Sequence, residues 1–248
     1  DGDIQIQTAR LQTNQVAMNA EGGMTDGAGR FDLTFGLNDL ASLLEGLSGP
    51  LDLRAAIEGQ DQTWDVAGNL TGPNGISAVI SGGASRPDGT VDLSVTGDVP
   101  LLIAEPFIAP RTLVGDAAFD ITVQGQPGLE AVRGTVTIAD ARASDPGTRL
   151  VVEGINLNVG LANSTANVDL SGQLRTGGTI TVSGPVALTA PFDAGITVAL
   201  QELTVIDPTL YEVNMSGNAS IQGPLLGGAA VTAGVMIDRA EIRIPSGL

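Results

Sequence analysis

The sequence contains no cysteine, no histidine and no lysine. Without these side chains the chain has no thiolate nucleophile, imidazole base or Schiff-base lysine, and no zinc site made of His and Cys. Disulfide bonds are excluded too, so cysteine usage carries no information about the redox compartment. Enzyme classes that depend on these groups are therefore excluded.

Aromatic residues and positive charges are scarce. Phe, Trp and Tyr make up 3% of the chain, and the 42% hydrophobic content comes mainly from Val, Ile, Leu and Ala. All 11 basic residues are arginines and 28 residues are acidic, which gives a net charge of −17. Such an acidic surface repels phosphate backbones, so no nucleic-acid partner is expected. Compact globules usually fill their cores with aromatics, so evenly spread aliphatic residues favour an extended sheet.

The acidic residues form no catalytic or metal-binding motif. A carboxylate pair is the minimum for glycoside hydrolysis, but here Asp and Glu mostly fall between apolar positions, as on the wet face of a strand. Residues 22–29, GGMTDGAG, are similar to a single degenerate calcium-binding nonapeptide, a motif that needs tandem copies, and we interpret them as a turn. We therefore expect no enzyme activity, no cofactor and no metal.

Hydrophobicity alternates at period two along most of the chain. Phe31, Leu33 and Phe35, for example, alternate with Asp32 and Thr34. This alternation is typical of a strand with one buried and one wet face. Turn signals recur at roughly 10 to 15 residues, and short turns imply antiparallel neighbours. We predict an all-β fold: one elongated, curved, antiparallel-rich sheet over residues 1–248, of the β-taco or open β-solenoid type, with an apolar concave groove.

One segment departs from this pattern. Four leucines lie at helical spacing, at Leu40, Leu43, Leu44 and Leu47. Asn38 or Asp39 is suited to cap the start of a helix. We predict at most one short helix, near residues 39–46.

No run reaches the roughly 18 apolar residues typical of a membrane helix. The chain begins at Asp1 without a methionine or a signal-type segment. We expect it to be part of a longer protein whose membrane anchor lies outside these residues.

The apolar face itself is the candidate functional feature. An open sheet must curl, pair with a second sheet or be coated, and alternation alone does not separate a closed core from a trough for hydrocarbon chains. The candidate groove residues are Leu157, Val159, Leu170, Ile180, Val182, Val186, Leu188, Ile196, Val198, Leu200, Val213, Met215, Ile221, Val235 and Ile237.

Several segments follow one another in an order that resembles the TamB family, the inner-membrane-anchored component of the translocation and assembly module. Those in the last third are residues 177–186 (GGTITVSGPV), 207–211 (DPTLY), 217–228 (GNASIQGPLLGG) and 239–245 (RAEIRIP). Residues 39–51 and 113–117 (LVGDA) are similar to recurring TamB elements.

The resemblance implies a function and a location. TamB-like proteins, grouped with AsmA-like and bridge-type lipid transfer proteins, are anchored in the inner membrane by a helix. They cross the periplasm as a taco-shaped β-structure with an apolar groove, which is thought to carry phospholipid to the outer membrane. Their C-terminal domain meets the outer-membrane barrel protein TamA. By this resemblance the chain stops just short of that domain, its partners are phospholipid acyl chains, and a TamA-like barrel binds a C-terminal domain absent here.

Two other functions remain open at this point. An adhesin-like or autotransporter-passenger β-solenoid with a closed core fits the same composition. A β-fold glycosidase is a third possibility, testable by its activity on polysaccharides.

Overall fold

The computed structural model describes residues 4–43, 47–85, 88–207 and 209–243. Its first nine strands are β1 (Ile4–Gln12), β2 (Val16–Thr25), β3 (Ala28–Leu37), β4 (Leu51–Gln60), β5 (Thr63–Thr71), β6 (Ser77–Ser85), β7 (Thr90–Pro100), β8 (Thr112–Val114) and β9 (Asp116–Gly125). The remaining strands are β10 (Val132–Asp145), β11 (Leu150–Ala162), β12 (Thr165–Leu174), β13 (Thr179–Ala187), β14 (Asp193–Asp207), β15 (Tyr211–Pro224) and β16 (Ala230–Ile242).

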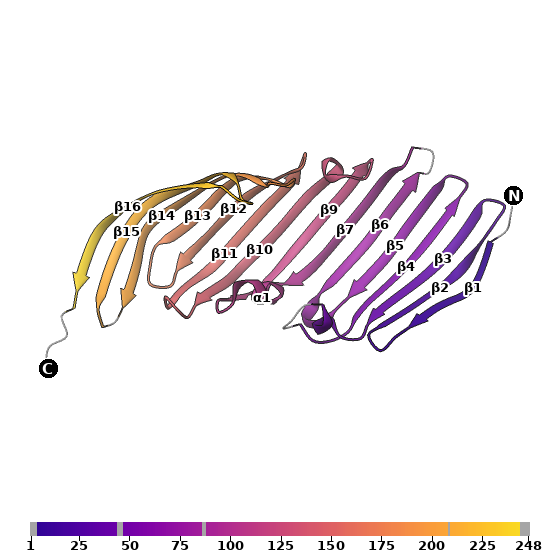
Figure 1. Ribbon diagram of the computed structural model, residues 1–248, viewed down its shortest axis with the longest axis horizontal. Helices are drawn as coiled ribbons and strands as arrows, with labels where there is room; N and C mark the ends of the chain where they lie inside the picture. Colours follow the sequence, from indigo (N-terminus) through magenta and orange to yellow (C-terminus); the bar gives the residue numbers. More distant parts are fainter. Residues whose placement is uncertain (1–3, 44–46, 86–87, 208, 244–248) are drawn as a thin grey trace. The chain divides into compact units, whose positions relative to one another are not determined.

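The strands form one open, antiparallel sheet. Hydrogen bonding runs from β1 through β7 to β9 and on to β16, and Figure 1 shows the strands in this order. The short strand β8 lies off this path and pairs with β10. Within this order β1 and β16 are the two edges. The predicted all-β class, with antiparallel neighbours in an open sheet, is confirmed.

In the residues that the structure describes, helical structure is limited to short turns. The 3-10 helices are Leu40–Ser42, Pro73–Gly75, Leu101–Ala104 and Leu129–Ala131, and the α-helix α1 is Glu105–Ile108. The predicted segment near residues 39–46 thus forms a single 3-10 turn that Asp39 caps, and its residues 44–46 lie outside the described part of the chain. The α-helix lies elsewhere, at a position that the leucine spacing did not indicate.

The chain divides into two compact units. The N-terminal unit contains Asp1–Phe107 and Asp116–Thr135, and the C-terminal unit contains Ile108–Gly115 and Val136–Leu248. The prediction of a single elongated segment over residues 1–248 stays a prediction.

The N-terminal unit has a small core at one end of its strands. Leu37 and Ile76 are buried there together with Leu40 and Leu47, which come from the loop between β3 and β4. Phe35, Leu51, Leu70, Leu102 and Ile103 are among the partly buried residues that pack around them. Of the four leucines at helical spacing, Leu40 and Leu47 therefore contribute to this core, whereas Leu43 is 70% exposed.

The turn predicted at residues 22–29 is confirmed. Asp26 and Gly27 join β2 to β3 with φ values of 49° and 81°. Positive φ at both central residues is typical of a two-residue β-hairpin loop, in which Asp-Gly is a preferred pair. Among the described residues no cluster of three acidic side chains could hold a metal ion.

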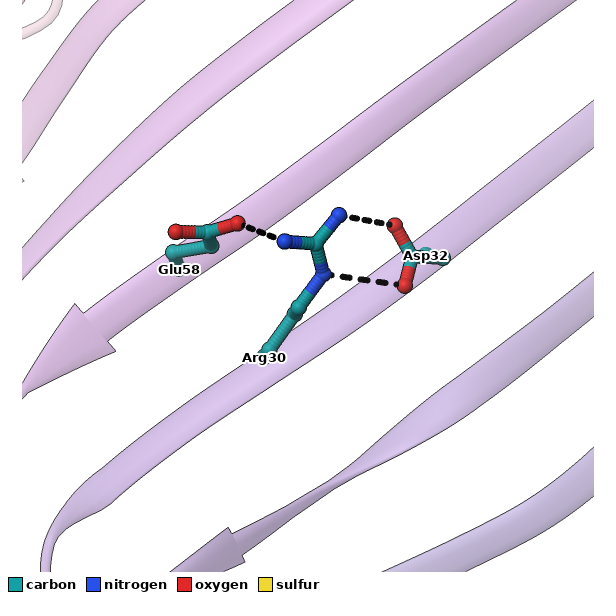
Figure 2. Close-up of polar contacts among 3 residues, drawn as sticks. All are labelled: Arg30, Asp32 and Glu58. Atoms are coloured by element: carbon teal, nitrogen blue, oxygen red, sulfur yellow. Dashed lines mark hydrogen bonds and ion pairs between the residues drawn. The ribbon is translucent and has the colours of Figure 1, made fainter.

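An ion-pair cluster joins two strands of the N-terminal unit. The guanidinium group of Arg30 donates to both carboxylate oxygens of Asp32, at 3.1 Å each, and also to Glu58 on β4 (Figure 2). These hydrogen bonds and charges raise the pKa of Arg30, and its hydrogen bond lowers the pKa of Asp32. The cluster is exposed, so it contributes little to stability.

The strands of the C-terminal unit are bent by bulges. The register of β14 against β15 shifts between Leu200 and Leu203, where Glu202 has a φ of 50°. The register of β15 against β16 also shifts, between Asn214 and Met215. Asp238 of β16 is the extra residue in this bulge. Bulges increase the local bend and twist of a strand, and β14 to β16 visibly arch (Figure 1).

Candidate functional site: an apolar face on each unit

The register of the C-terminal unit places apolar side chains of successive strands on one face. Residues directly opposite each other in an antiparallel pair point to the same side of the sheet. Leu157 on β11 faces Leu170 on β12, Leu170 faces Val182 on β13, and Val182 faces Val198 on β14. These side chains therefore form a continuous aliphatic row across four strands.

A parallel row extends this surface to the edge of the sheet. Ile196 on β14 faces Ile221 on β15, and Ile221 faces Val231 on β16. Met215 likewise faces Ile237. We call the surface made by these rows the apolar face of the C-terminal unit.

Fourteen of the 15 candidate groove residues lie within strands on this face. They are Leu157, Val159, Leu170, Ile180, Val182, Val186, Ile196, Val198, Leu200, Val213, Met215, Ile221, Val235 and Ile237. Leu188 is one residue past the end of β13, and its N–H donates to the carbonyl of Ser164 at 2.8 Å. The structure thus brings the set together, with Leu188 at the strand ends.

The apolar face is mostly half-exposed. Among the candidate groove residues Ile196 is buried, while Val235 and Ile237 on the edge strand are 55% and 62% exposed. The others have intermediate exposure. A face covered by a second sheet would be largely buried, so in the described part of the chain these side chains remain accessible to a ligand.

The opposite face of the same strands is polar. Asn158 on β11 faces Asp169 on β12, which faces Ser183 on β13, which faces Thr197 on β14. All four side chains are exposed. The C-terminal unit therefore has one wet face and one aliphatic face, as the period-two pattern predicts.

The N-terminal unit carries a second apolar face, which the candidate groove residues do not include. Leu11 faces Met18, Met18 faces Phe35, and Phe35 faces Leu53 on β4. A hollow of about 510 Å³ lies over these residues and is lined mainly by apolar side chains. The alternation of Phe31, Leu33 and Phe35 was the sequence signal that could have placed these positions on the list.

Aromatic rings on this second face lie over glycines. A Cβ atom on Gly59 would lie 2.4 Å from Trp64, and one on Gly22 would lie 2.8 Å from the ring of Phe31. The rings of Phe31 and Trp64 are tilted against each other with centroids 6.0 Å apart. Each of these two rings therefore covers a position that has no side chain of its own.

Outside the ion-pair cluster, three aspartates in the described part of the chain have a lowered pKa. Hydrogen bonds lower the pKa of Asp39, Asp145 and Asp207, whereas the general acid of a glycosidase needs a raised pKa. Arg239 pairs with Glu241, and Arg243 lies 3.6 Å from Glu212, so both arginines have acidic partners.

These features define a class: an open antiparallel β-sheet protein in which aliphatic side chains form an accessible face. Residues 165–248 match the model of the TamB C-terminal domain. The match covers the last third of the chain and confirms the resemblance to the TamB family. No curated protein and no solved structure matches the chain.

The match also corrects one expectation. The chain was expected to stop just short of the C-terminal domain, but the matched residues begin at 165, in β12. Motif order indicated the family, but residues 239–245 (RAEIRIP) lie inside the matched domain and not before it. A TamB domain indicates a part in TamB-type outer-membrane assembly or lipid transport, a family role that is not enzymatic.

Proposed function

We propose that this chain is a periplasmic segment of a TamB-like protein and that its apolar faces hold phospholipid acyl chains during transport between the inner and outer membranes. The observation that carries the proposal is the aliphatic face of the C-terminal unit, where the rows across β11 to β16 remain half-exposed. The alternative closed-core β-solenoid needs the same side chains to be covered, so their exposure favours the lipid-binding function.

The energetics of such a face suit transport. Removing a CH₂ group from water contributes about 0.8 kcal/mol, so a 16-carbon chain is held by at most about 13 kcal/mol. Movement across successive aliphatic rows keeps most of this contact, whereas escape into water loses all of it. The acyl chain therefore slides more easily than it dissociates.

The composition of the face supports this movement. Across β11 to β14 the facing residues are Leu and Val, with no ring and no charge among the row Leu157, Leu170, Val182 and Val198. A uniform aliphatic surface offers similar contact at each step, so no single position traps the chain. Headgroups remain in water beside the face.

Location and partners belong to the same proposal. The parent protein is anchored in the inner membrane by a helix outside these residues, and a TamA-like outer-membrane barrel binds its C-terminal domain. No helix in the described part of the chain has the length and hydrophobicity needed to span a membrane. The family match at residues 165–248 supports the involvement of an outer-membrane partner.

A pair of substitutions on adjacent residues tests the acyl-chain site. Val182→Asp places a carboxylate in the aliphatic row, and Ser183→Asp places the same group on the exposed polar face. We expect Val182→Asp to weaken binding of a fluorescent fatty acid at least about tenfold, because a carboxylate held against hydrocarbon costs several kcal/mol.

Ser183→Asp is expected to bind like the unmodified chain. Circular dichroism should be the same for both variants, because both positions are accessible. Equal binding by the two variants, or no binding by the delipidated chain, contradicts the proposal.

A further inference from the structure

The two ends of the strands in the C-terminal unit differ in charge. Because the strands are antiparallel, the turns at residues 163–164, 188–192 and 225–229 lie on one side of the sheet. We call these three turns the neutral rim. The turns that follow β10, β12 and β14 lie on the opposite side, which we call the charged rim.

All arginines of the unit lie at or near the charged rim. They are Arg111, Arg142, Arg149, Arg175, Arg239 and Arg243. By contrast, residues 213–237 contain no charged residue, and residues 182–200 contain only Asp193. The neutral rim therefore has almost no formal charge in a chain whose net charge is −17.

Backbone hydrogen bonds join the turns of the neutral rim. The N–H of Leu188 donates to Ser164 at 2.8 Å, linking the first two turns. The N–H groups of Leu225 and Leu226 donate to the carbonyls of Phe192 and Pro191, both at 3.2 Å, which links the second turn to the third. These hydrogen bonds hold the backbones of Phe192, Leu225 and Leu226 in adjacent turns of the rim.

These three side chains are exposed. Phe192 is 36% exposed, Leu225 47% and Leu226 62%. Phe192 also has a φ of 60°, a conformation that is unfavourable for a bulky side chain. Strain of this kind tends to persist where the position of a side chain has a function.

We propose that the neutral rim docks on the surface of a zwitterionic phospholipid bilayer and inserts Phe192, Leu225 and Leu226 into its interface. Phe and Leu are the side chains that interfacial amphipathic helices bury at this depth. The rim has no arginine that would attract anionic lipid, and its single carboxylate does not oppose a neutral surface. The occupant that fits these charges is a neutral bilayer.

The position of the rim gives docking a consequence. Val186, Ile196 and Ile221 of the apolar face lie within a few residues of the rim turns. A bilayer at this rim places its hydrocarbon next to the aliphatic rows. The inference goes beyond the proposed function, and because the docking residues are separate from the acyl-chain rows, the two proposals can fail independently.

A single labelling site provides the first test. The chain has no cysteine, so Leu226→Cys accepts one polarity-sensitive fluorophore. The control is Leu210→Cys, at a leucine that is 51% exposed in a turn of the charged rim. With phosphatidylcholine vesicles we expect a blue shift in emission at position 226 and none at position 210. Equal shifts at both positions, or no shift at position 226, overturn the proposal.

A rim variant provides the second test. Phe192→Asn combined with Leu226→Ser removes two apolar anchors, and asparagine tolerates positive φ, so the variant is expected to fold normally. Co-flotation with phosphatidylcholine vesicles should fall at least about tenfold, the effect of losing contacts worth 1.4 kcal/mol or more. Unchanged co-flotation overturns the proposal.

Two further comparisons separate this proposal from its alternatives. The rim variant should keep fatty-acid binding, while Val182→Asp should lose fatty-acid binding and keep co-flotation. Binding that requires anionic lipid indicates charge-driven adsorption and overturns neutral docking. If added soluble protein shifts the emission of the fluorophore at position 226 and vesicles do not, the rim binds a protein partner. That outcome also overturns the proposal of bilayer docking.

Discussion

At the residue scale, Asp39 closes the loop between β3 and β4. Its Oδ1 atom accepts the N–H of Ala41 at 3.1 Å and the N–H of Gly49 at 3.0 Å. The N–H of Leu40 donates to the Gly49 carbonyl at 2.8 Å, so both ends of the loop are tied together. The hydrogen bond from Gly49, and then that from Ala41, lowers the pKa of Asp39.

This lowered pKa makes the effect of Asp39→Ala depend on pH. The unfolded state takes up a proton near the ordinary pKa, about 3.9, whereas the folded state resists it. The stabilisation by Asp39 is therefore present above pH 4 and is lost as the pH falls below the folded pKa. Thermal unfolding should show a lower midpoint for Asp39→Ala at pH 7 and a smaller difference at pH 3. Ser48→Ala, in the same loop, should show no such dependence, and a constant Asp39→Ala effect would contradict the assignment.

Gly97 illustrates how close packing selects glycine. A Cβ atom there would lie 2.1 Å from the carbonyl oxygen of Ser77 and 2.7 Å from the ring of Phe119. We expect Gly97→Ala to lower the free energy of unfolding by about 1–3 kcal/mol, measured by urea denaturation. Gly234→Ala is the control, because nothing lies within 4 Å of the added Cβ, and its effect should stay within about 0.5 kcal/mol. If both substitutions change the free energy of unfolding equally, close packing is not the reason for a glycine at position 97.

At the element scale, the two edge strands are protected differently. The register of β1 shifts between Ile6 and Ala9, and the strand carries Arg10, both of which discourage pairing with another chain. Residues 230–237 of β16 have no charge and no proline, and Val231, Val235 and Ile237 are exposed there. Within the described residues no strand pairs with the outer side of this part of β16, so a further strand can pair there.

A lysine on this segment should reduce self-association. Met236 is 68% exposed and faces Ser216, on the side opposite the apolar face. Met236→Lys adds an edge charge without changing the aliphatic rows, and we expect smaller concentration-dependent association in sedimentation velocity. Thr181→Lys adds the same charge on the interior strand β13 and should have no such effect. If both variants reduce association equally, the change in net charge explains the effect, and a charge placed on the edge strand β16 does not.

At the scale of the whole molecule, charge and apolar surface are separated. The net charge of −17 keeps a sheet with accessible aliphatic rows in solution. The chain has no histidine or cysteine, so this charge changes little between pH 6 and pH 8. The proposed binding of hydrocarbon on one face is therefore compatible with a highly charged surface elsewhere.

Native mass spectrometry of the purified chain should reveal bound phospholipid. Half-exposed aliphatic rows are hydrated unless hydrocarbon covers them, so we expect adducts at phospholipid masses that disappear after lipid extraction. The double variant Val182→Asp and Val198→Asp, altered at one facing pair, should carry less lipid. A preparation that is free of lipid from the start would count against acyl-chain binding.

Local periodicity predicted much of the fold because side-chain direction in a strand depends only on residue position. The alternation over β12 to β15 was enough to place Leu170, Val182, Val198 and Ile221 on one side. The short turns likewise implied antiparallel pairs, and motif order in the last third indicated the TamB family. The prediction of a helix near residues 39–46 was the weakest, because leucine spacing alone does not show what the leucines pack against. Leu40 and Leu47 are buried in the core of the N-terminal unit.

The sequence by itself therefore determined the all-β class, the apolar and polar sides of each strand, and the absence of cysteine, histidine and lysine chemistry. Only the tertiary structure decided which rows align, where the bulges at Glu202 and Asp238 shift the register, and how exposed the rows remain. It also decided that Phe192 and Leu226 meet at one rim, although 33 positions separate them. These outcomes depend on pairing between distant segments, which a period of two residues does not encode.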